Sequence, residues 1–302
     1  MSRALSTSTG QPYGLKRVAR LWRVPRSTVY AHRRRRAAAV DARPAPRRPG
    51  PPGPCDDATL LGHIRKVLAD SPWHGEGYRK VWARLRFQGM RTSKDRVRRL
   101  MRAHGLQAPH RVGCAHGPKT HDRTIIPERP NQMWGTDLTG TVTVRDGAVG
   151  VFVAVDHATA ECVGLHAAVR CTRFEALEPI RQGVRDYFGG FGENVAQGLT
   201  LRHDHGSQYL ADDFQAEIRF LGIASSPAFV REPEGNGCVE RFIRTLKENL
   251  LWVRTFETVE ELRQALLEFK RQYNDQWILE RLAYRTPAQA RKDACSTVEV
   301  AA

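Results

Sequence analysis

Three carboxylates stand out by the positions that they occupy. Asp137 lies within "WGTDL", a stretch typical of a strand, where aspartate is disfavoured. Asp204 follows a short apolar run in "RHDHG", and Glu240 lies near the start of a helical pattern in "GNGCVERFIRTLKENL". Mg²⁺ prefers oxygen ligands, and two such ions about 4 Å apart can activate an attacking oxygen and stabilise a leaving one on the same phosphorus. If the fold brings these residues together, they predict metal-dependent chemistry on phosphate esters.

The elements that would position these carboxylates form an α/β pattern. Three segments rich in valine and threonine, "MWGTDLTGTVTV", "AVGVFVAVDH" and "ECVGLHAAV", predict an antiparallel meander. Helices and strands then alternate: a helix in "TRFEALEPIRQGVRDYF", a strand at 198–203, a helix at 210–221, a strand at 222–226 and a long helix from about Gly237. This order predicts a mixed five-stranded sheet flanked by helices. The three carboxylates meet if strands one and four are neighbours and the long helix packs across them.

Charge divides the chain into two unlike parts. Residues 1–130 hold 29 Lys and Arg against 8 Asp and Glu, whereas residues 131–302 hold 19 against 24. The net charge of the whole chain is +16. A strongly basic front joined to a mildly acidic remainder predicts that the front binds a polyanion such as DNA.

The first basic segment, residues 1–36, is typical of a helix-turn-helix. Leu15, Val18, Ala19 and Trp22 share one helical face, Pro25 interrupts the pattern, and Ser27 can cap a second helix that begins near Val29 and Tyr30. A plain helical hairpin is the alternative. If the second helix lies in the major groove, Arg26 is placed to contact bases. The arginine run that follows, which includes Arg33 and Arg34, is placed to contact phosphates.

A second helix-turn-helix is predicted at 58–112. Val81, Leu85, Val97, Leu100 and Met101 are spaced to face inward. Gly89 permits the turn, Thr92 or Ser93 caps the next helix, and Gly105 ends it. The basic residues expected to project from this candidate recognition helix and to contact DNA are Lys94, Arg98, Arg99 and Arg102. Both front segments are thus predicted to be small all-α domains.

The remaining segments predict no chemistry of their own. Residues 37–57, rich in Pro, Ala and Arg, predict an extended linker, and residues 113–130 a polar connector. His110, Cys114, His116 and His121 fit no standard zinc spacing. Six cysteines without a CxxC pair, no signal peptide and no apolar run of about 20 residues predict free thiols and a cytoplasmic protein without contact to a membrane.

Residues 131–292 resemble the integrase core of insertion-sequence transposases, which are related to retroviral integrases and have a ribonuclease H-like fold. The matching features are "WGTD", "HDHGSQY", the thirty-five residues between Asp204 and Glu240, "ERFIRTLKENL" with Lys247 seven residues beyond Glu240, and the tail "YNDQW…RTPAQAR". Residues 58–112 resemble the helix-turn-helix that precedes this core in the second reading frame of such elements. Residues 293–302 are a tail.

The resemblance implies a DNA transposase of the Asp-Asp-Glu type, a polynucleotidyl transferase. Asp137, Asp204 and Glu240 would be its catalytic residues and would hold two Mg²⁺ or Mn²⁺ ions, while Arg244 and Lys247 would contact DNA. Its partners would be the terminal inverted repeats of the element, target DNA, further copies of the chain and a protein from an upstream frame. The protein would act at the nucleoid. The alternative is a catalytically inactive, repressor-like relative.

Four neighbouring residues are interpreted differently. Many relatives carry an Asp-Asn pair where this chain has Gly235 and Asn236, so Asn236 is expected to cap the catalytic helix. Asp156 is expected to cap the turn after the second strand. His203 and His205 are expected to form hydrogen bonds or to face DNA, with metal binding as the alternative.

Overall fold

The computed structural model describes residues 4–37, 55–109, 127–228 and 236–299. The chain divides into two compact units, Met1–Pro52 and Gly53–Ala302. Most of the expected linker at 37–57, most of the expected connector at 113–130, and His110, Cys114, His116 and His121 lie outside the described residues. Across the described ranges, no helix combines the length and the apolar character that a membrane span requires.

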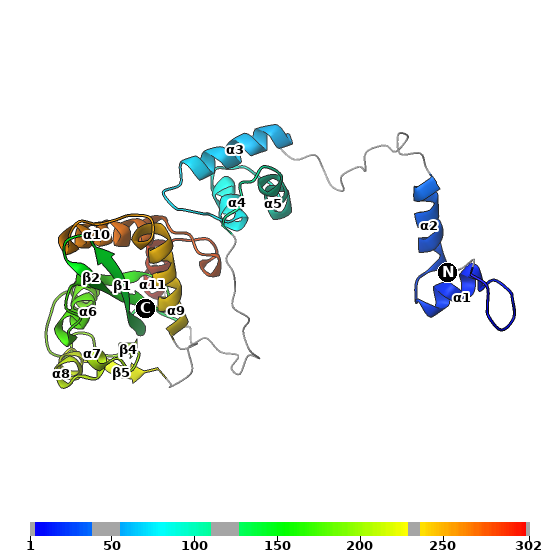
Figure 1. Cartoon of the computed structure of the whole chain (residues 1–302). Helices are drawn as coiled ribbons and strands as arrows, with labels where there is room; N and C mark the ends of the chain where they lie inside the picture. Colours follow the sequence, from blue (N-terminus) through cyan, green and yellow to red (C-terminus); the bar gives the residue numbers. More distant parts are fainter. Residues whose placement is uncertain (1–3, 38–54, 110–126, 229–235, 300–302) are drawn as a thin grey trace. The chain divides into compact units, whose positions relative to one another are not determined.

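The first unit contains two helices, α1 (Gly14–Leu21) and α2 (Arg26–Ala37), drawn in dark blue in Figure 1. Ala19 is the buried residue of α1, whereas Trp22 lies beyond its end and is 60% exposed, so the expected inward position of Trp22 is wrong. The carbonyl of Pro25 accepts hydrogen bonds from the N–H groups of Thr28 and Val29. Because helical bonding already begins at Pro25, Ser27 lies inside the first turn of α2 instead of capping it.

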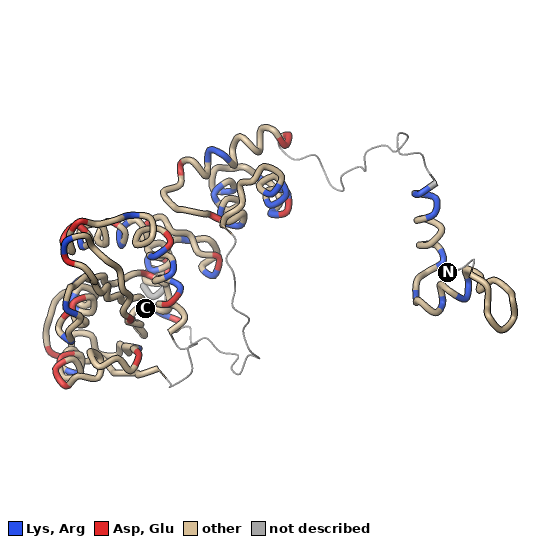
Figure 2. The backbone as a smooth tube through the Cα atoms, viewed as in Figure 1, with Lys and Arg blue, Asp and Glu red and all other residues tan. Residues whose placement is uncertain are grey.

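Three helices follow: α3 (Asp57–Ala69), α4 (Tyr78–Phe87) and α5 (Lys94–Ala103). The inward residues expected from the sequence are buried, and they form one core with Leu60, Ile64 and Val67 of α3. Ser93 caps α5 by accepting a hydrogen bond from the N–H of Arg96, and Gly105 has a φ of 66° directly after the helix. Gly89, with a φ of 80°, forms the turn after α4. Figure 2 shows Lys and Arg along α2, α4 and α5.

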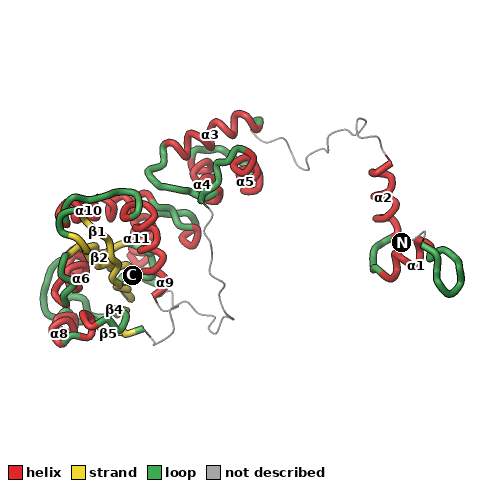
Figure 3. The backbone as a smooth tube through the Cα atoms, in the orientation of Figure 1, coloured by secondary structure: helices red, strands yellow, loops and turns green. Residues whose placement is uncertain are grey.

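A five-stranded sheet follows, shown in yellow in Figure 3. Its strands are β1 (Met133–Thr143), β2 (Gly147–Asp156), β3 (Cys162–Ala168), β4 (Thr200–His203) and β5 (Ala224–Pro227). The order across the sheet is β3-β2-β1-β4-β5. The first three strands are antiparallel, while β4 is parallel to β1 and β5 is parallel to β4. Strands one and four are neighbours, which is the condition under which the three carboxylates can meet. The expected mixed five-stranded sheet of a ribonuclease H-like core is confirmed.

Helices cover both faces of the sheet (Figure 1). The helical elements of this part of the chain are α6 (Arg173–Phe188), α7 (Ser207–Leu210), α8 (Asp212–Phe220), α9 (Gly237–Leu246), the π-helix η3 (Lys247–Leu251), α10 (Val259–Gln276), the 3₁₀ turn η4 (Glu280–Leu282) and α11 (Pro287–Glu299). Strand β2 shows how the faces separate. Val151 and Val153 pack with residues of α9 and α10, whereas Phe152 and Ala154 pack with residues of α6 and α8. This alternation follows from the two-residue period of a strand.

Side chains form hydrogen bonds with main-chain groups at the outer edge of β3. Asn274 donates to the carbonyl of Cys162 and accepts from its N–H, both at 2.9 Å. Gln182 makes the same pair of bonds with Leu165, and Lys270 donates to the carbonyl of Val163. An edge strand whose main-chain groups are occupied cannot pair with a further strand at those positions. These contacts also fix α6 and α10 on either side of β3.

Candidate active site

Asp137 lies in β1 on the face of the sheet that α9 covers. In the antiparallel register Asp137 is opposite Val153, and Gly135 is opposite Val155. Directly opposed residues project from the same face, and both valines pack with residues of α9 and α10. The side chain of Asp137 is half-buried, and its Oδ1 accepts a hydrogen bond of 2.8 Å from the N–H of Leu138.

Asp204 comes directly after β4, at the level of Asp137. The parallel register pairs Gly135 with Arg202 as its last pair, and each aspartate lies two residues further along the chain. Neighbouring parallel strands present paired residues on the same face, so Asp204 and Asp137 follow Arg202 and Gly135 on the face that α9 covers. Asp204 is exposed, and its Oδ1 accepts a hydrogen bond of 2.8 Å from the N–H of Gly206, which shapes the turn into α7.

Glu240 lies in the first turn of α9, which packs against β1 at Gly135, a residue without a side chain. A Cβ atom at Gly135 would come within 2.5 Å of Val239 Cγ2 and 2.6 Å of Asn236 Oδ1. Such contacts mean that α9 approaches β1 more closely than any residue with a side chain would permit. Val239 is fully buried against this strand, and Glu240 follows it on the exposed side of the helix.

Burial and the charges of the other two carboxylates act on the pKa of Asp137. Burial raises the pKa of Asp137 to about 6, and the negative charges of Asp204 and Glu240 add to the rise. The N–H of Leu138 and the ammonium of Lys247 oppose it. Burial also raises the pKa of Glu240. The residues that the sequence singled out therefore lie within range of one another's charge, and Lys247 belongs to the same group.

A divalent cation fits the chemistry of this donor set. Carboxylate oxygens are hard ligands. Burial is the main cause of the raised pKa of Asp137, and the smaller contribution from the charges of Asp204 and Glu240 would be relieved by a bound cation. Within residues 4–37, 55–109, 127–228 and 236–299, no group of three or more His, Cys, Asp or Glu is already arranged as a metal site. In the described residues the three carboxylates thus lie on one face of the sheet but do not form a complete coordination site.

The two histidines that flank Asp204 differ in their surroundings. His203 is fully buried, its Nδ1 lies 2.7 Å from the carbonyl oxygen of Asp204 and its Nε2 lies 2.9 Å from Ser225 Oγ. Burial lowers the pKa of His203. Both ring nitrogens are thus occupied by hydrogen bonds, which agrees with the expected hydrogen-bonding role. His205 is exposed.

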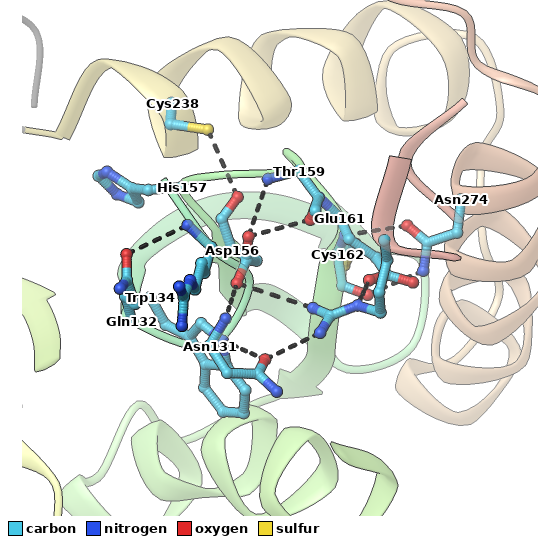
Figure 4. A network of polar contacts seen from close by, with 12 residues as sticks. Asn131, Gln132, Trp134, Asp156, His157, Thr159, Glu161, Cys162, Cys238 and Asn274 are labelled. Carbon is cyan, nitrogen blue, oxygen red and sulfur yellow. Dashed lines mark hydrogen bonds and ion pairs between the residues drawn. The ribbon is translucent and has the colours of Figure 1, made fainter. Parts of the chain in front are cut away.

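Asp156 belongs to a separate buried network, shown in Figure 4. Its Oδ1 accepts hydrogen bonds from the N–H and the hydroxyl of Thr159, at 2.8 and 3.0 Å, so the expected turn cap is present. Its Oδ2 accepts from the N–H of Asn131 at 2.7 Å and lies 3.7 Å from Arg291 of α11. Arg291 also pairs with Glu161. The contact with Arg291 could not be predicted from the sequence, because 134 residues lie between it and Asp156.

Asn236 does not act as expected. It occupies the N-cap position of α9, yet its side chain makes no capping hydrogen bond. Instead its Nδ2 donates to the main-chain carbonyl of Thr136 at 3.2 Å, across a hundred residues of sequence. The expected cap is therefore wrong, because the close approach of α9 to β1 directs the amide toward the strand.

The sequence analysis predicted no role for two further residues near the aspartates, Tyr209 and Arg202. Tyr209 is fully buried, and its pKa is raised by burial and by the charges of Asp137 and Asp204. Arg202 is 5% exposed and lies in β4, two residues before Asp204. The period of two that places Asp204 on this face also places Arg202 there. That periodicity is the signal that could have identified it.

The residues expected to contact DNA are mostly exposed. Arg26, Arg33, Arg34, Arg98, Arg99, Arg102 and Arg244 are exposed, whereas Lys94 and Lys247 are half-buried. Lys94 lies over the ring of Trp82, with its Nζ 4.5 Å from the ring centre. Arg98 is 3.1 Å from Asp95, Arg99 is 3.3 Å from Asp57 and Arg244 is 3.0 Å from Glu248. These exposed ion pairs are weak and leave the guanidinium groups available to phosphate.

Comparison with known proteins assigns both parts of the second unit. Residues 54–112 match an HTH-like domain, and residues 221–287 match an integrase core domain. Transposase InsD for insertion element IS2A/D/F/H/I/K of Escherichia coli is 28% identical over 294 residues, which cover 94% of this chain and 93% of the relative. Transposase InsD for insertion element IS2-9 of Escherichia coli strain K12 is also 28% identical, over 94% of this chain and 91% of the relative.

Catalytic cores of retroviral integrases are among the solved structures that align with this chain. The catalytic core domain of BIV integrase aligns with a TM-score of 0.42 at 20% identity, over 56% of this chain and 99% of that chain. The HTLV-2 integrase catalytic core domain in complex with magnesium aligns with a TM-score of 0.41 at 18% identity, over the same shares. Along almost its whole length the chain is similar to insertion-sequence transposases, and it matches an HTH-like domain in front of an integrase core domain.

Proposed function

We propose that this chain is a transposase that binds the ends of a mobile element and catalyses divalent-metal-dependent DNA strand cleavage and strand transfer. The observation that supports this most is the convergence of Asp137, Asp204 and Glu240, from two neighbouring strands and one helix, on a single face of the sheet. Their spacing in the sequence is that of the integrase core, and transposases match nearly the whole chain.

Asp137, Asp204 and Glu240 are the proposed catalytic residues, and together they would hold two Mg²⁺ or Mn²⁺ ions. Bound there, the ions would lower the pKa of an attacking water or hydroxyl and stabilise the oxygen that leaves. In cleavage, a water oxygen bonds to the phosphorus at the element end, the bond to the 3′ oxygen breaks, and a 3′-hydroxyl is freed. In transfer, that hydroxyl attacks a phosphorus of the target strand, loses its proton and displaces the 3′ oxygen there.

The basic residues are proposed to hold the DNA substrates. Arg26 and Arg98 would contact bases, while Arg33, Arg34, Lys94, Arg99 and Arg102 would contact the backbone of the element end. Arg244 and Lys247, on the helix that carries Glu240, would contact DNA next to the reacting phosphate. Since both ends of an element must be processed, the active form is proposed to be a homo-oligomer. Its proposed place of action is the nucleoid, and a protein from an upstream frame is a further proposed partner.

The test uses the DNA that flanks the gene. Terminal inverted repeats found there would be placed in a labelled duplex and incubated with the full chain in Mg²⁺ or Mn²⁺. Specific nicks at the repeat ends and joining of the freed 3′ ends to a second duplex are expected. Specific binding without any cleavage in either metal would favour the alternative, an inactive relative of a transposase.

A further inference from the structure

Asn236 connects the helix that carries Glu240 to the strand that carries Asp137. The residue is 8% exposed, and its Nδ2 donates to the carbonyl of Thr136 at 3.2 Å. Thr136 directly precedes Asp137, and Asn236 lies four residues before Glu240. The last residue of β1 that pairs with β4 is Gly135, so the bond is made just where this pairing ends. The side chain of Asn236 thus links α9 to β1 close to both Asp137 and Glu240.

The packing around Gly135 makes this connection sensitive to position. The first turn of α9 packs directly on the backbone of this glycine. A Cβ atom at Gly135 would lie 2.5 Å from Val239 Cγ2 and 2.6 Å from Asn236 Oδ1. Glu240 follows Val239 directly, so a shift or rotation of this turn moves Glu240 by a similar amount. Packing of Val239 fixes the distance of the helix from the strand. The directional bond from Asn236 is what fixes its rotation and its register along the strand.

Like charges make such a restraint necessary. Carboxylates on one face of the sheet repel one another when ionised. Glu240 lies in the first turn of α9, so the placement of this turn decides where its carboxylate lies. We propose that Asn236 is a positioning residue, which holds the first turn of α9 in register with β1 so that Glu240 reaches the ion shared with Asp137. This inference rests on the proposed function, in which Glu240 is a metal ligand.

Two substitutions separate this role from ordinary helix capping. Serine is a good N-cap residue, but its hydroxyl is too short to replace the amide that reaches Thr136. Alanine neither caps nor reaches. If Asn236 merely capped the helix, Asn236→Ser would behave like the wild type and Asn236→Ala would not. If Asn236 positions Glu240, both variants are impaired alike.

Asn274 provides a matched control. It is also an asparagine, it is also 8% exposed, and it too bonds the main chain of a strand, through Cys162 at the far edge of the sheet (Figure 4). Asn274→Ala loses two hydrogen bonds and should lower the melting temperature at least as much as Asn236→Ala. Because Asn274 lies in another region of the fold, Mn²⁺ affinity should stay at the wild-type value.

The measurement is the affinity of the full chain for Mn²⁺, obtained from the electron paramagnetic resonance signal of the free ion. Thermal unfolding is measured in parallel. Asn236→Ala and Asn236→Ser should each weaken Mn²⁺ binding roughly 3- to 10-fold, as expected for loss of one hydrogen bond. In the Glu240→Gln background, Asn236→Ala should cause no further loss, because its effect passes through Glu240.

The outcomes are distinguishable. The positioning role would be overturned if Asn236→Ser bound Mn²⁺ with wild-type affinity. It would also be overturned if Asn236→Ala weakened Mn²⁺ binding to the same extent in the Glu240→Gln background. Either result would leave the proposed function intact. Should Glu240→Gln alone leave Mn²⁺ affinity unchanged, the assignment of Glu240 as a ligand is wrong, and the positioning role is refuted with it. Weakening by both Asn236 variants without additivity supports the inference.

Discussion

Asp137→Asn should make the metal-free protein more stable at neutral pH, although it removes a residue of the proposed site. Burial, with added repulsion from Asp204 and Glu240, raises the pKa of Asp137 from 3.8 to about 6 in the folded chain. Between these pH values the folded chain retains a proton that the unfolded chain has lost, so folding stability falls as pH rises through this window and stays reduced above it. The shift corresponds to about 3 kcal/mol. Since Asp137 is only half-buried, solvent screening should leave about 1–2 kcal/mol.

Thermal unfolding of the full chain in EDTA measures this effect. At pH 8 the melting temperature of Asp137→Asn should exceed that of the wild type by roughly 2–6 °C, and at pH 4 the two should coincide. The Asn side chain can still accept the bond from Leu138, so no hydrogen bond is lost. Adding Mn²⁺ at pH 8 should raise the melting temperature of the wild type more than that of the variant. Equal melting temperatures at pH 8, or a variant that is less stable there, would refute the reasoning.

Three further predictions concern DNA binding and the buried network. Affinity of the chain for duplex DNA should fall about a thousandfold between 50 and 200 mM salt if the basic front neutralises roughly six phosphates; a flat titration would contradict the predicted DNA-binding front. Arg98→Ala should relax sequence preference and cost roughly 1–3 kcal/mol, whereas Arg33→Ala and Arg34→Ala should weaken all duplexes alike in competition assays. Arg291→Ala should lower the free energy of unfolding by about 3 kcal/mol, because it leaves Asp156 buried without its cation; an unchanged denaturation curve would show that Arg291 contributes little.

The architecture of the sheet followed from periodicity and local order. Alternate residues in β2 separate into the two cores on either side of it. Strands one and four are neighbours, which was the condition set for the carboxylates to meet, and their parallel register places Asp137 and Asp204 level with each other. Helix ends that depend on one residue, such as the cap at Ser93, were also predictable, because capping is a local interaction.

Contacts between distant segments were not predictable from the sequence. Asn236 carries the local signature of a cap, yet the close approach of α9 to Gly135 turns its amide toward Thr136. Asp156 was interpreted from its own turn, and its proximity to Arg291 arises only when α11 packs against the core. Lys94 was expected to project freely, but its half-buried side chain lies over Trp82. In each case tertiary packing decided among orientations that the local sequence permits.

The central claim, that Asp204 is catalytic and not merely the end of a strand, is tested most directly by its neutral isostere. Asp204→Asn keeps the acceptor for Gly206 but removes the charge that holds a divalent cation. Cleavage of a labelled element end would be measured in Mg²⁺ and Mn²⁺, with binding measured in Ca²⁺. The exposed Asp212 at the start of α8 provides the control, as Asp212→Asn. We expect Asp204→Asn to bind the end normally and to lose cleavage and joining, while Asp212→Asn keeps both. An Asp204→Asn protein that still cuts the element end would contradict the proposed site.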